Sequence, residues 1–380
     1  MKLIERSDEL KDKRKSGFRR WSYGVEKIGE NSKAKQMASY SLKNNDINNV
    51  KYKHEDKVKK VIRKCLFKKF EDALGDSVTI TAELQKYKKE QEEGKSYIGV
   101  ISIDGNKMGD MVKKINNFNA LKDFSRKIDK VYFEAIVEAI KGYRGKIGAE
   151  SLLLTPILQA GDDICLIVEA EHAIEIAANI IRKIKEISIR DDNKKVLGQF
   201  METDYLTACG GVAIVRYTYP FFEAVKIAEG LCDKAKETIY LVKSSKDEKI
   251  RNSFIHWEVV KRQVTTGVQY ESYVKSGNTQ VKYHIKPLCI DQDIPIEDNI
   301  FSYDAFIRII RGIQNIQKND EKDISNSLLE ELKRNIYAGI EQYNLFVEMS
   351  KKSIKELNNL LMNIFYENIK ETMLYINQHA

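Results

Sequence analysis

Two kinds of apolar pattern alternate through the middle of the chain. Continuous apolar runs of strand length indicate buried strands, and they occupy residues 97–103, 152–158, 164–168, 207–215 and 253–259. Between these runs, apolar residues recur at helical spacing over 118–140, over 173–187 and from Pro220 to Ala235. The order strand-helix-strand-strand-helix-strand predicts an α+β, ferredoxin-like βαββαβ unit. In that fold an antiparallel sheet carries helices on one face, and its first strand lies beside the central hairpin.

The regions on either side of this unit have other patterns. Residues 54–73 show helical spacing, but the rest of 1–95 is polar with weak periodicity. We therefore expect a basic, mostly helical N-terminal region over 1–95, with the βαββαβ unit and its last helix and strand over 96–260. Residues 261–300 contain Pro287 and Pro295 and predict a linker or β-rich connection. Residues 301–380 predict a C-terminal helical bundle, with runs over 301–317 and from 324 to about 375.

The composition describes a soluble globular protein with room for two or three domains. The chain has 380 residues, of which 42% are hydrophobic and 32% charged. No apolar stretch is long enough to span a bilayer, and the first residues lack the apolar core of a signal peptide. The five cysteines are far apart and form no Cys-x-x-Cys pair. We expect a cytoplasmic protein with no membrane contact, and with buried thiols in place of disulfides or a zinc knuckle.

Positive charge is concentrated near the N-terminus. Residues 1–95 carry 25 Lys and Arg against 16 Asp and Glu, while the chain as a whole has a net charge of +8. Aromatic residues such as Phe18, Trp21 and Tyr23 lie among these charges. This arrangement predicts RNA or another polyanion as a partner. The alternative is a solvated Lys-rich segment with no such partner.

Carboxylates follow the ends of two predicted strands that should be neighbours. Asp162 and Asp163 follow Ala160-Gly161 at the tip of the expected hairpin, and Asp104 ends the first strand. Ionised Asp side chains on one turn repel each other, and a divalent cation between them would relieve that repulsion. The three carboxylates therefore predict a site for Mg²⁺ or Mn²⁺, with two metal ions on a nucleoside triphosphate. The alternative is an Asp-rich hairpin turn and an Asx turn, since Asp is a common turn residue.

Four motifs, in this order, resemble those of the CRISPR polymerase palm. They are Ile103-Asp104-Gly105-Asn106-Lys107-Met108-Gly109, Ala160-Gly161-Asp162-Asp163, Cys209-Gly210-Gly211-Val212-Ala213 and Asp233-Lys234-Ala235-Lys236. This palm is the cyclase-like domain of the type III CRISPR large subunit, which is related to GGDEF diguanylate cyclases and class III adenylyl cyclases. The resemblance covers about 97–260 and, more loosely, 285–350.

The resemblance also implies roles for individual residues. Asp104 and Asp162 would be metal ligands, with Asp163 as a third ligand or an orienting group. The turn from Gly105 through Asn106 and Met108 to Gly109 would present backbone N–H groups to the triphosphate. Gly161 would keep the hairpin tip bare for the nucleotide. Two lysines would reach the phosphates, namely Lys236 and Lys234.

The sequence departs from the family in several places. Ala160 stands where the family usually has Gly, and its methyl group could narrow the base or phosphate site. There is no His-Asp dipeptide for an HD nuclease, the zinc-binding cysteines that often precede the palm are absent, and only one palm signature is present. A metal-dependent DNase is therefore not expected.

The resemblance implies a standalone, single-palm nucleotidyl cyclase. It would convert ATP or another NTP to a cyclic di- or oligonucleotide, such as a cyclic oligoadenylate, with release of pyrophosphate, as a second messenger in anti-phage defence. Because one palm has one triphosphate site, we expect a homodimer with facing palms, at least transiently, to close the ring. The alternative to the dimer is a monomer that docks on a different palm-bearing or RNA-bound partner. The alternative is a non-cyclising scaffold subunit of a type III CRISPR effector complex that binds nucleotide and RNA, which the basic N-terminal region favours.

Overall fold

The computed structural model describes residues 66–89, 96–148, 152–201, 203–241, 252–260, 286–291, 301–318, 326–338 and 340–350, together with 355 and 359. The chain divides into two compact units, Met1–Asp291 and Gln292–Ala380. The predictions made for residues 1–65, for most of the 261–300 connection and for most of the helix beyond 350 lie outside the described residues.

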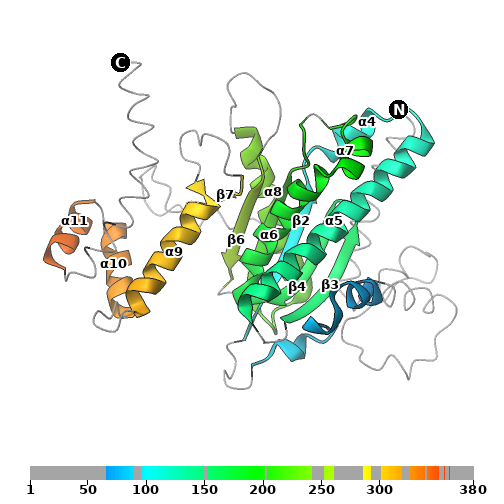
Figure 1. Ribbon diagram of the computed structural model, residues 1–380. Helices are drawn as coiled ribbons and strands as arrows, with labels where there is room; N and C mark the ends of the chain where they lie inside the picture. The colour runs from blue at the N-terminus through cyan, green and yellow to red at the C-terminus, as the bar shows by residue number, and fades with distance from the viewer. Residues whose placement is uncertain are drawn as a thin grey trace, which may run out of the picture. The chain divides into compact units, whose positions relative to one another are not determined.

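A seven-stranded sheet forms the centre of the first unit (Figure 1). In the order in which they pair, its strands are β1 (Val78–Ile80), β3 (Leu152–Ala160), β4 (Asp163–Glu169), β2 (Tyr97–Gly105), β5 (Ala208–Arg216), β6 (Phe254–Val259) and β7 (Leu288–Cys289). β2 is antiparallel to both of its neighbours, and β3 is antiparallel to β4. The predicted βαββαβ unit is therefore confirmed, with its strand boundaries within a few residues of those expected.

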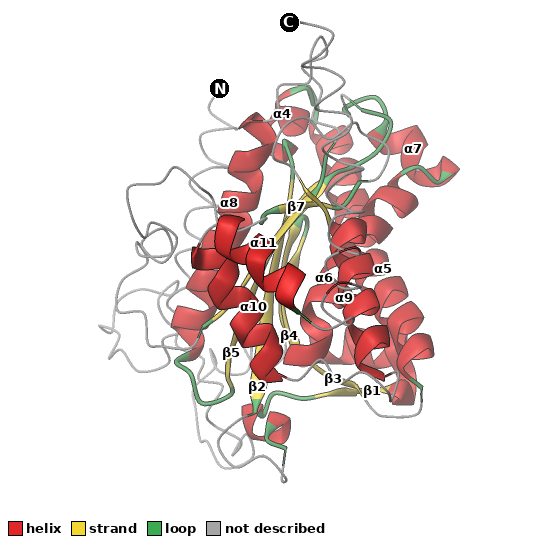
Figure 2. Ribbon diagram, turned by 90° about the vertical axis from the view of Figure 1, so that its left-hand side faces the viewer, coloured by secondary structure: helices red, strands yellow, loops and turns green. Residues whose placement is uncertain are grey.

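Helices cover both faces of this sheet (Figure 2). α5 (Phe118–Ile147) and α6 (Ala170–Ser188) belong to the βαββαβ unit and pack together on one face, as expected. α8 (Phe221–Leu241) follows the unit and covers the opposite face. Neighbouring residues of a strand point to opposite faces: a Cβ on Gly210 would meet Ile181 of α6, whereas a Cβ on Gly211 would meet the backbone of α8. α8 connects the parallel strands β5 and β6, so it adds a second layer that the βαββαβ unit lacks.

Apolar residues occupy the positions that these two layers need. α5 begins after Asn117, whose side chain accepts a hydrogen bond from the Ala120 N–H at 2.7 Å and so caps the helix. The described cysteines are all buried and free, as expected: Cys165, Cys209, Cys232 and Cys289. On the other face, sheet residues such as Val100 and Ile167 pack with Ala228 and Leu231 of α8.

Residues on both sides of 96–260 join the same unit. Phe70 is fully buried, and its ring packs edge-on against Phe133 of α5 at 5.1 Å. β1 pairs in parallel with β3, and the Tyr87 hydroxyl donates to the Ile167 carbonyl at 3.1 Å. β7 extends the other edge of the sheet through β6. The boundaries that we expected at 95 and 260 thus run through one packed unit, because short flanking segments complete its edges and its core.

The second unit is helical where it is described. It contains the short strand β8 (Phe301–Ser302) and the helices α9 (Tyr303–Lys318), α10 (Asn326–Ala338) and α11 (Ile340–Met349). The first unit also contains two short helices, α4 (Met108–Lys113) and α7 (Asp191–Leu197). None of the described helices is both long and apolar enough to cross a membrane.

Candidate metal and nucleotide site

The fold brings the three predicted carboxylates together at one end of the central strands. Asp104 is the penultimate residue of β2, Asp162 lies in the turn of the β3–β4 hairpin, and Asp163 begins β4. β2 and β4 pair with Ile103 opposite Ile164, so the next step of this register places Asp104 opposite Asp163. One oxygen atom from each of the three carboxylates lies within 4.8 Å of the others, and all three residues are half-buried. Hard, negatively charged oxygen ligands at this spacing suit Mg²⁺ or Mn²⁺.

Lys236 is a cation that contacts Asp104 of this cluster. Its side chain comes from α8, and the ammonium lies 2.7 Å from Oδ2 of Asp104 and donates to the Gly105 carbonyl at 3.0 Å. Burial of the ammonium would lower the pKa of Lys236, but the neighbouring Asp104 carboxylate outweighs it and holds that pKa above its ordinary value of 10.5. Lys236 is therefore charged at neutral pH and balances part of the negative charge of the cluster.

Lys234 lies two positions before Lys236 on α8. Side chains at that spacing on a helix point in different directions. The structure therefore brings Lys236 to the carboxylates by a face of α8 that Lys234 does not share, and a phosphate role for Lys234 stays a prediction.

The hairpin tip is shaped by its backbone and held by a side chain of α5. Gly161 has φ +63, a left-handed conformation that favours glycine, and a Cβ there would meet nothing within 4 Å. The Asp129 carboxylate accepts hydrogen bonds from the Gly161 N–H at 3.2 Å and from the Gln159 amide at 2.9 Å. Lys69 donates to the Gln159 side chain at 2.8 Å. Asp129 thus fixes the turn that carries Asp162.

The turn between β2 and α4 is anchored to the segment before β5. The Asn106 N–H donates to the Thr207 carbonyl at 2.9 Å, and the Asn106 amide donates to the Thr207 hydroxyl at 3.0 Å. The Asn106 N–H is thus bonded within the protein, and a nucleotide-binding role for the turn from Gly105 to Gly109 stays a prediction. Met108 is buried beneath the turn, whereas Gly109 has open space where a Cβ would lie.

Gly105 makes the closest approach in the site. A Cβ at this position would lie 2.5 Å from the Tyr132 hydroxyl, 2.7 Å from Cε of Met108 and 3.0 Å from Cβ of Asp162. Atoms that close cannot be accommodated without a shift of the surrounding structure. The glycine lets β2 pass directly over Tyr132 and beside the hairpin.

Tyr132 lies beneath the acidic cluster and was not expected in the site. It is fully buried on α5, and its hydroxyl makes no hydrogen bond with any residue that the structure describes. Burial first, and then the negative charge of Asp162, raises the pKa of Tyr132 well above its ordinary value, so the hydroxyl stays protonated. The helical pattern places Tyr132 with the apolar residues on the inner face of the helix. Its hydroxyl on an otherwise apolar face is the signal that could have identified it.

A cysteine lies close to the carboxylates without sharing their chemistry. Cys209 pairs with Asp104 across β2 and β5. Burial raises the pKa of Cys209 to about 12, so it remains a thiol at neutral pH. The candidate ligands near Asp104 are therefore oxygen atoms.

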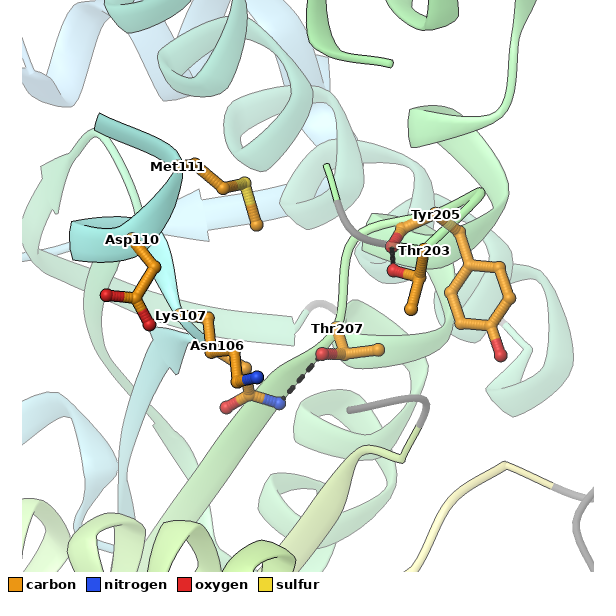
Figure 3. A pocket seen from close by; sticks show the side chains of 7 residues that line it. All are labelled: Asn106, Lys107, Asp110, Met111, Thr203, Tyr205 and Thr207. Carbon is orange, nitrogen blue, oxygen red and sulfur yellow. Dashed lines mark hydrogen bonds between the residues drawn. The ribbon is translucent and has the colours of Figure 1, made fainter. Parts of the chain in front are cut away.

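A small hollow lies beside the β2–α4 turn (Figure 3). It is lined by Asn106, Lys107, Asp110, Met111, Thr203, Tyr205 and Thr207. Because β4 and β5 flank β2 on opposite sides, the turn separates this hollow from Asp162 and Asp163.

The chain was compared with protein families, with curated proteins and with solved structures. Residues 97–247 match the family model of the Cas10/Cmr2 second palm domain. A comparison with curated proteins gave no match. Similar solved structures include the Csm1–Csm4 cassette in complex with pppApApA, at 14% identity and a TM-score of 0.32, covering 78% of this chain and 38% of that chain.

Two further structures are similar to a comparable degree. The Csm1–Csm4 subcomplex of the type III-A CRISPR-Csm interference complex is 15% identical, with a TM-score of 0.31, covering 71% of this chain and 36% of that chain. The Csm1–Csm4 cassette in complex with cA4 is 17% identical, with a TM-score of 0.31, covering 43% of this chain and 21% of that chain. The chain thus spans well under half the length of these neighbours.

Proposed function

From the match of residues 97–247 to the Cas10/Cmr2 second palm domain, we propose that the chain is a metal-dependent nucleotidyltransferase that makes a cyclic di- or oligonucleotide from ATP or another NTP. The observation that carries the proposal is the cluster of Asp104, Asp162 and Asp163 with Lys236 against it. Such a product would be a second messenger, a role that fits anti-phage defence. We base the cyclic product and the defence role on the resemblance of the palm motifs.

The carboxylates fit a divalent metal by their chemistry and their spacing. All three are hard oxygen donors, they lie within reach of one ion or a closely spaced pair, and a buried hydroxyl lies beneath them. Asp104 and Asp162 would hold the metal, with Asp163 as a third ligand or an orienting group. A bound Mg²⁺ or Mn²⁺ would supply charge neutralisation on the phosphates and would lower the pKa of the attacking hydroxyl.

The residues of the chain position the reacting groups. In the reaction, a ribose 3′- or 2′-oxygen of one nucleotide forms a bond to the α-phosphorus of another, the bond between the α- and β-phosphates breaks, and pyrophosphate leaves. The ammonium of Lys236 lies beside Asp104, where it can turn from that carboxylate to a phosphate oxygen and stabilise the negative charge that develops there.

The proposal includes a homodimer. A single palm offers one triphosphate site, and a two-fold interface would repeat that site in the opposite orientation, so that each ribose hydroxyl could face the other α-phosphate. Light scattering with and without a non-hydrolysable ATP analogue tests this step. A strict monomer that makes cyclic product at high dilution would refute it.

The main experiment is a product assay with matched variants. Purified protein is incubated with labelled NTPs and Mg²⁺ or Mn²⁺, and the products are resolved by mass. We expect Asp104→Ala and Asp162→Ala to abolish turnover while the protein stays folded, and Asp123→Ala, an exposed carboxylate on α5, to leave turnover unchanged. Product formation by Asp104→Ala or Asp162→Ala at the wild-type rate would refute the metal assignment, and unfolding of these variants would favour a structural role for the turns.

A second candidate function is a scaffold subunit of a type III CRISPR effector complex that binds nucleotide and RNA without cyclising. The observation that favours it is the excess of Lys and Arg over residues 1–95. The same assay separates the two, because the scaffold would bind ATP and RNA but release no pyrophosphate.

A further inference from the structure

The buried hydroxyl of Tyr132 lies beneath the carboxylates of the proposed site. A fully buried hydroxyl without a hydrogen-bond partner among the described residues is rare in folded proteins, and it calls for a physical reason. A phenylalanine would fill the same volume without the cost of burying an unpaired hydroxyl. The hydroxyl therefore suggests a hydrogen-bond partner beyond the contacts that the structure describes.

The groups around the hydroxyl indicate that this partner is a carboxylate of the cluster. The hydroxyl lies 2.5 Å from the position of a Cβ on Gly105, and Cβ of Asp162 lies 3.0 Å from the same point. Among the three carboxylates, Asp162 has the largest electrostatic effect on Tyr132. Asp104 already accepts the ammonium of Lys236 through Oδ2. Because an ionised carboxylate only accepts hydrogen bonds and a protonated phenol donates one, the pair is complementary.

This inference rests on the function proposed above. We propose that Tyr132 is a positioning residue whose hydroxyl donates a hydrogen bond to a carboxylate oxygen of Asp162 in the metal-loaded site. One oxygen of Asp162 then faces the metal and the other is held from below by α5. Groups that orient a metal ligand in this way fix its rotamer and strengthen metal binding. Tyr132 would act with Asp129, which fixes the backbone of the same hairpin three positions earlier on α5.

The test compares two tyrosines of one helix. Tyr132→Phe removes the hydroxyl beneath the cluster, and Tyr143→Phe removes a hydroxyl on the same helix that hydrogen-bonds to Nδ1 of His172 at 2.9 Å, away from the carboxylates. The dissociation constant for Mn²⁺ is measured by electron paramagnetic resonance on full-length protein without nucleotide, and thermal unfolding is measured in parallel. We expect Tyr132→Phe to be at least as stable as wild type in the absence of metal and to bind Mn²⁺ about 10- to 100-fold more weakly. We expect Tyr143→Phe to keep the wild-type affinity.

A Tyr132→Phe protein that binds Mn²⁺ as tightly as wild type would overturn the proposal. If this variant does not fold, a second measurement decides. 3-Fluorotyrosine is placed at position 132 alone, or at 143 alone, and ¹⁹F resonances are followed while Mg²⁺ is added. A saturable shift confined to the label at 132 is expected, and an unmoved resonance would overturn the proposal.

The same data separate this inference from the proposed function. If wild type binds Mn²⁺ but makes no cyclic product, the cyclase proposal fails and the role of Tyr132 is still decided by the affinities. If wild type binds no divalent metal, the role of Tyr132 fails with it.

Discussion

Replacing Lys236 with methionine should change metal binding and nucleotide use in opposite directions. Methionine keeps most of the length of the side chain and removes the ammonium that lies 2.7 Å from Asp104. In the free protein this ammonium competes with a metal ion for the same carboxylate. At an effective dielectric constant of 20, two unit charges about 4 Å apart interact by about 4 kcal/mol, so the competition is large enough to detect. We therefore expect Lys236→Met to bind Mn²⁺ alone at least several-fold more tightly than wild type.

The same substitution should weaken the reaction of the triphosphate. A hydrogen bond to a charged group contributes about 1.5–3 kcal/mol, and each 1.4 kcal/mol corresponds to a factor of ten. If the ammonium of Lys236 turns from Asp104 to a phosphate oxygen in the transition state, Lys236→Met should lower kcat/KM for ATP by about 10- to 150-fold. Lys226→Met, on the exposed side of α8, serves as the matched control and should change neither quantity.

The assay combines electron paramagnetic resonance titration with Mn²⁺ and steady-state kinetics over a range of ATP concentrations. Lys236→Met should also lose unfolding free energy, because Asp104 then faces two other carboxylates without its cation. Since the pKa of Lys236 is raised in the folded state, this contribution is fully present below 10.5 and is lost only as the pH rises through the higher folded-state value. The stability difference between wild type and Lys236→Met should therefore stay constant from neutral pH to about pH 9. Unchanged Mn²⁺ affinity together with unchanged kinetics would show that Lys236 is only a structural partner of Asp104.

Two other substitutions test how the site is held. Gly105→Ala should place a methyl group 2.5 Å from the Tyr132 hydroxyl and destabilise the fold by about 1–3 kcal/mol, which thermal unfolding measures. Gly142→Ala on α5 is the control, because it has open space around it, and it should be neutral or stabilising. Equal melting temperatures for the two variants would contradict the packing argument. Asp129→Ala should remove the acceptor for the Gly161 N–H, lower the free energy of unfolding by about 0.5–1.5 kcal/mol and weaken Mn²⁺ binding. Asp129→Asn should keep most of the stability and of the Mn²⁺ affinity, because its amide oxygen can still accept the hydrogen bond. Identical Mn²⁺ affinities for wild type and Asp129→Ala would show that the hairpin does not need this contact.

Sequence patterns were sufficient for the elements with long apolar runs. β2, the β3–β4 hairpin and β5 all lie within a few residues of the predicted strands, because each is buried on both faces and reads as a continuous apolar run. β1 spans only Val78–Ile80, and α4 spans only Met108–Lys113. Elements of that length contain too few residues to show a period, so only the pairing of β1 with β3 reveals that residues before 95 complete the sheet.

The candidate carboxylates followed from the topology, but their surroundings did not. Placing the first strand beside the hairpin was enough to bring Asp104 toward Asp162 and Asp163. The contact between Lys236 and the Gly105 carbonyl joins residues 131 positions apart and depends on α8 lying on the face opposite α5 and α6. No local pattern specifies that face. Tyr132 and Asp129 were missed for a related reason, since a helical pattern assigns residues to an inner or an outer face but does not say which strand or turn each side chain reaches.

The arrangement of charges around the cluster explains why one site draws on three separate layers. Three carboxylates within 4.8 Å of one another are unfavourable unless positive charge or hydrogen-bond donors surround them. The strands and their hairpin supply the carboxylates, α8 supplies the ammonium of Lys236 from one face, and α5 places the Tyr132 hydroxyl beneath the cluster from the other. Asp129 of α5 holds the backbone of the hairpin. Three carboxylates carry more negative charge than the ammonium of Lys236 balances, and such an excess suits a divalent cation. A palm covered by helices on one face only would lack one of these two partners, so the second helical layer is a requirement of the site as well as of the core.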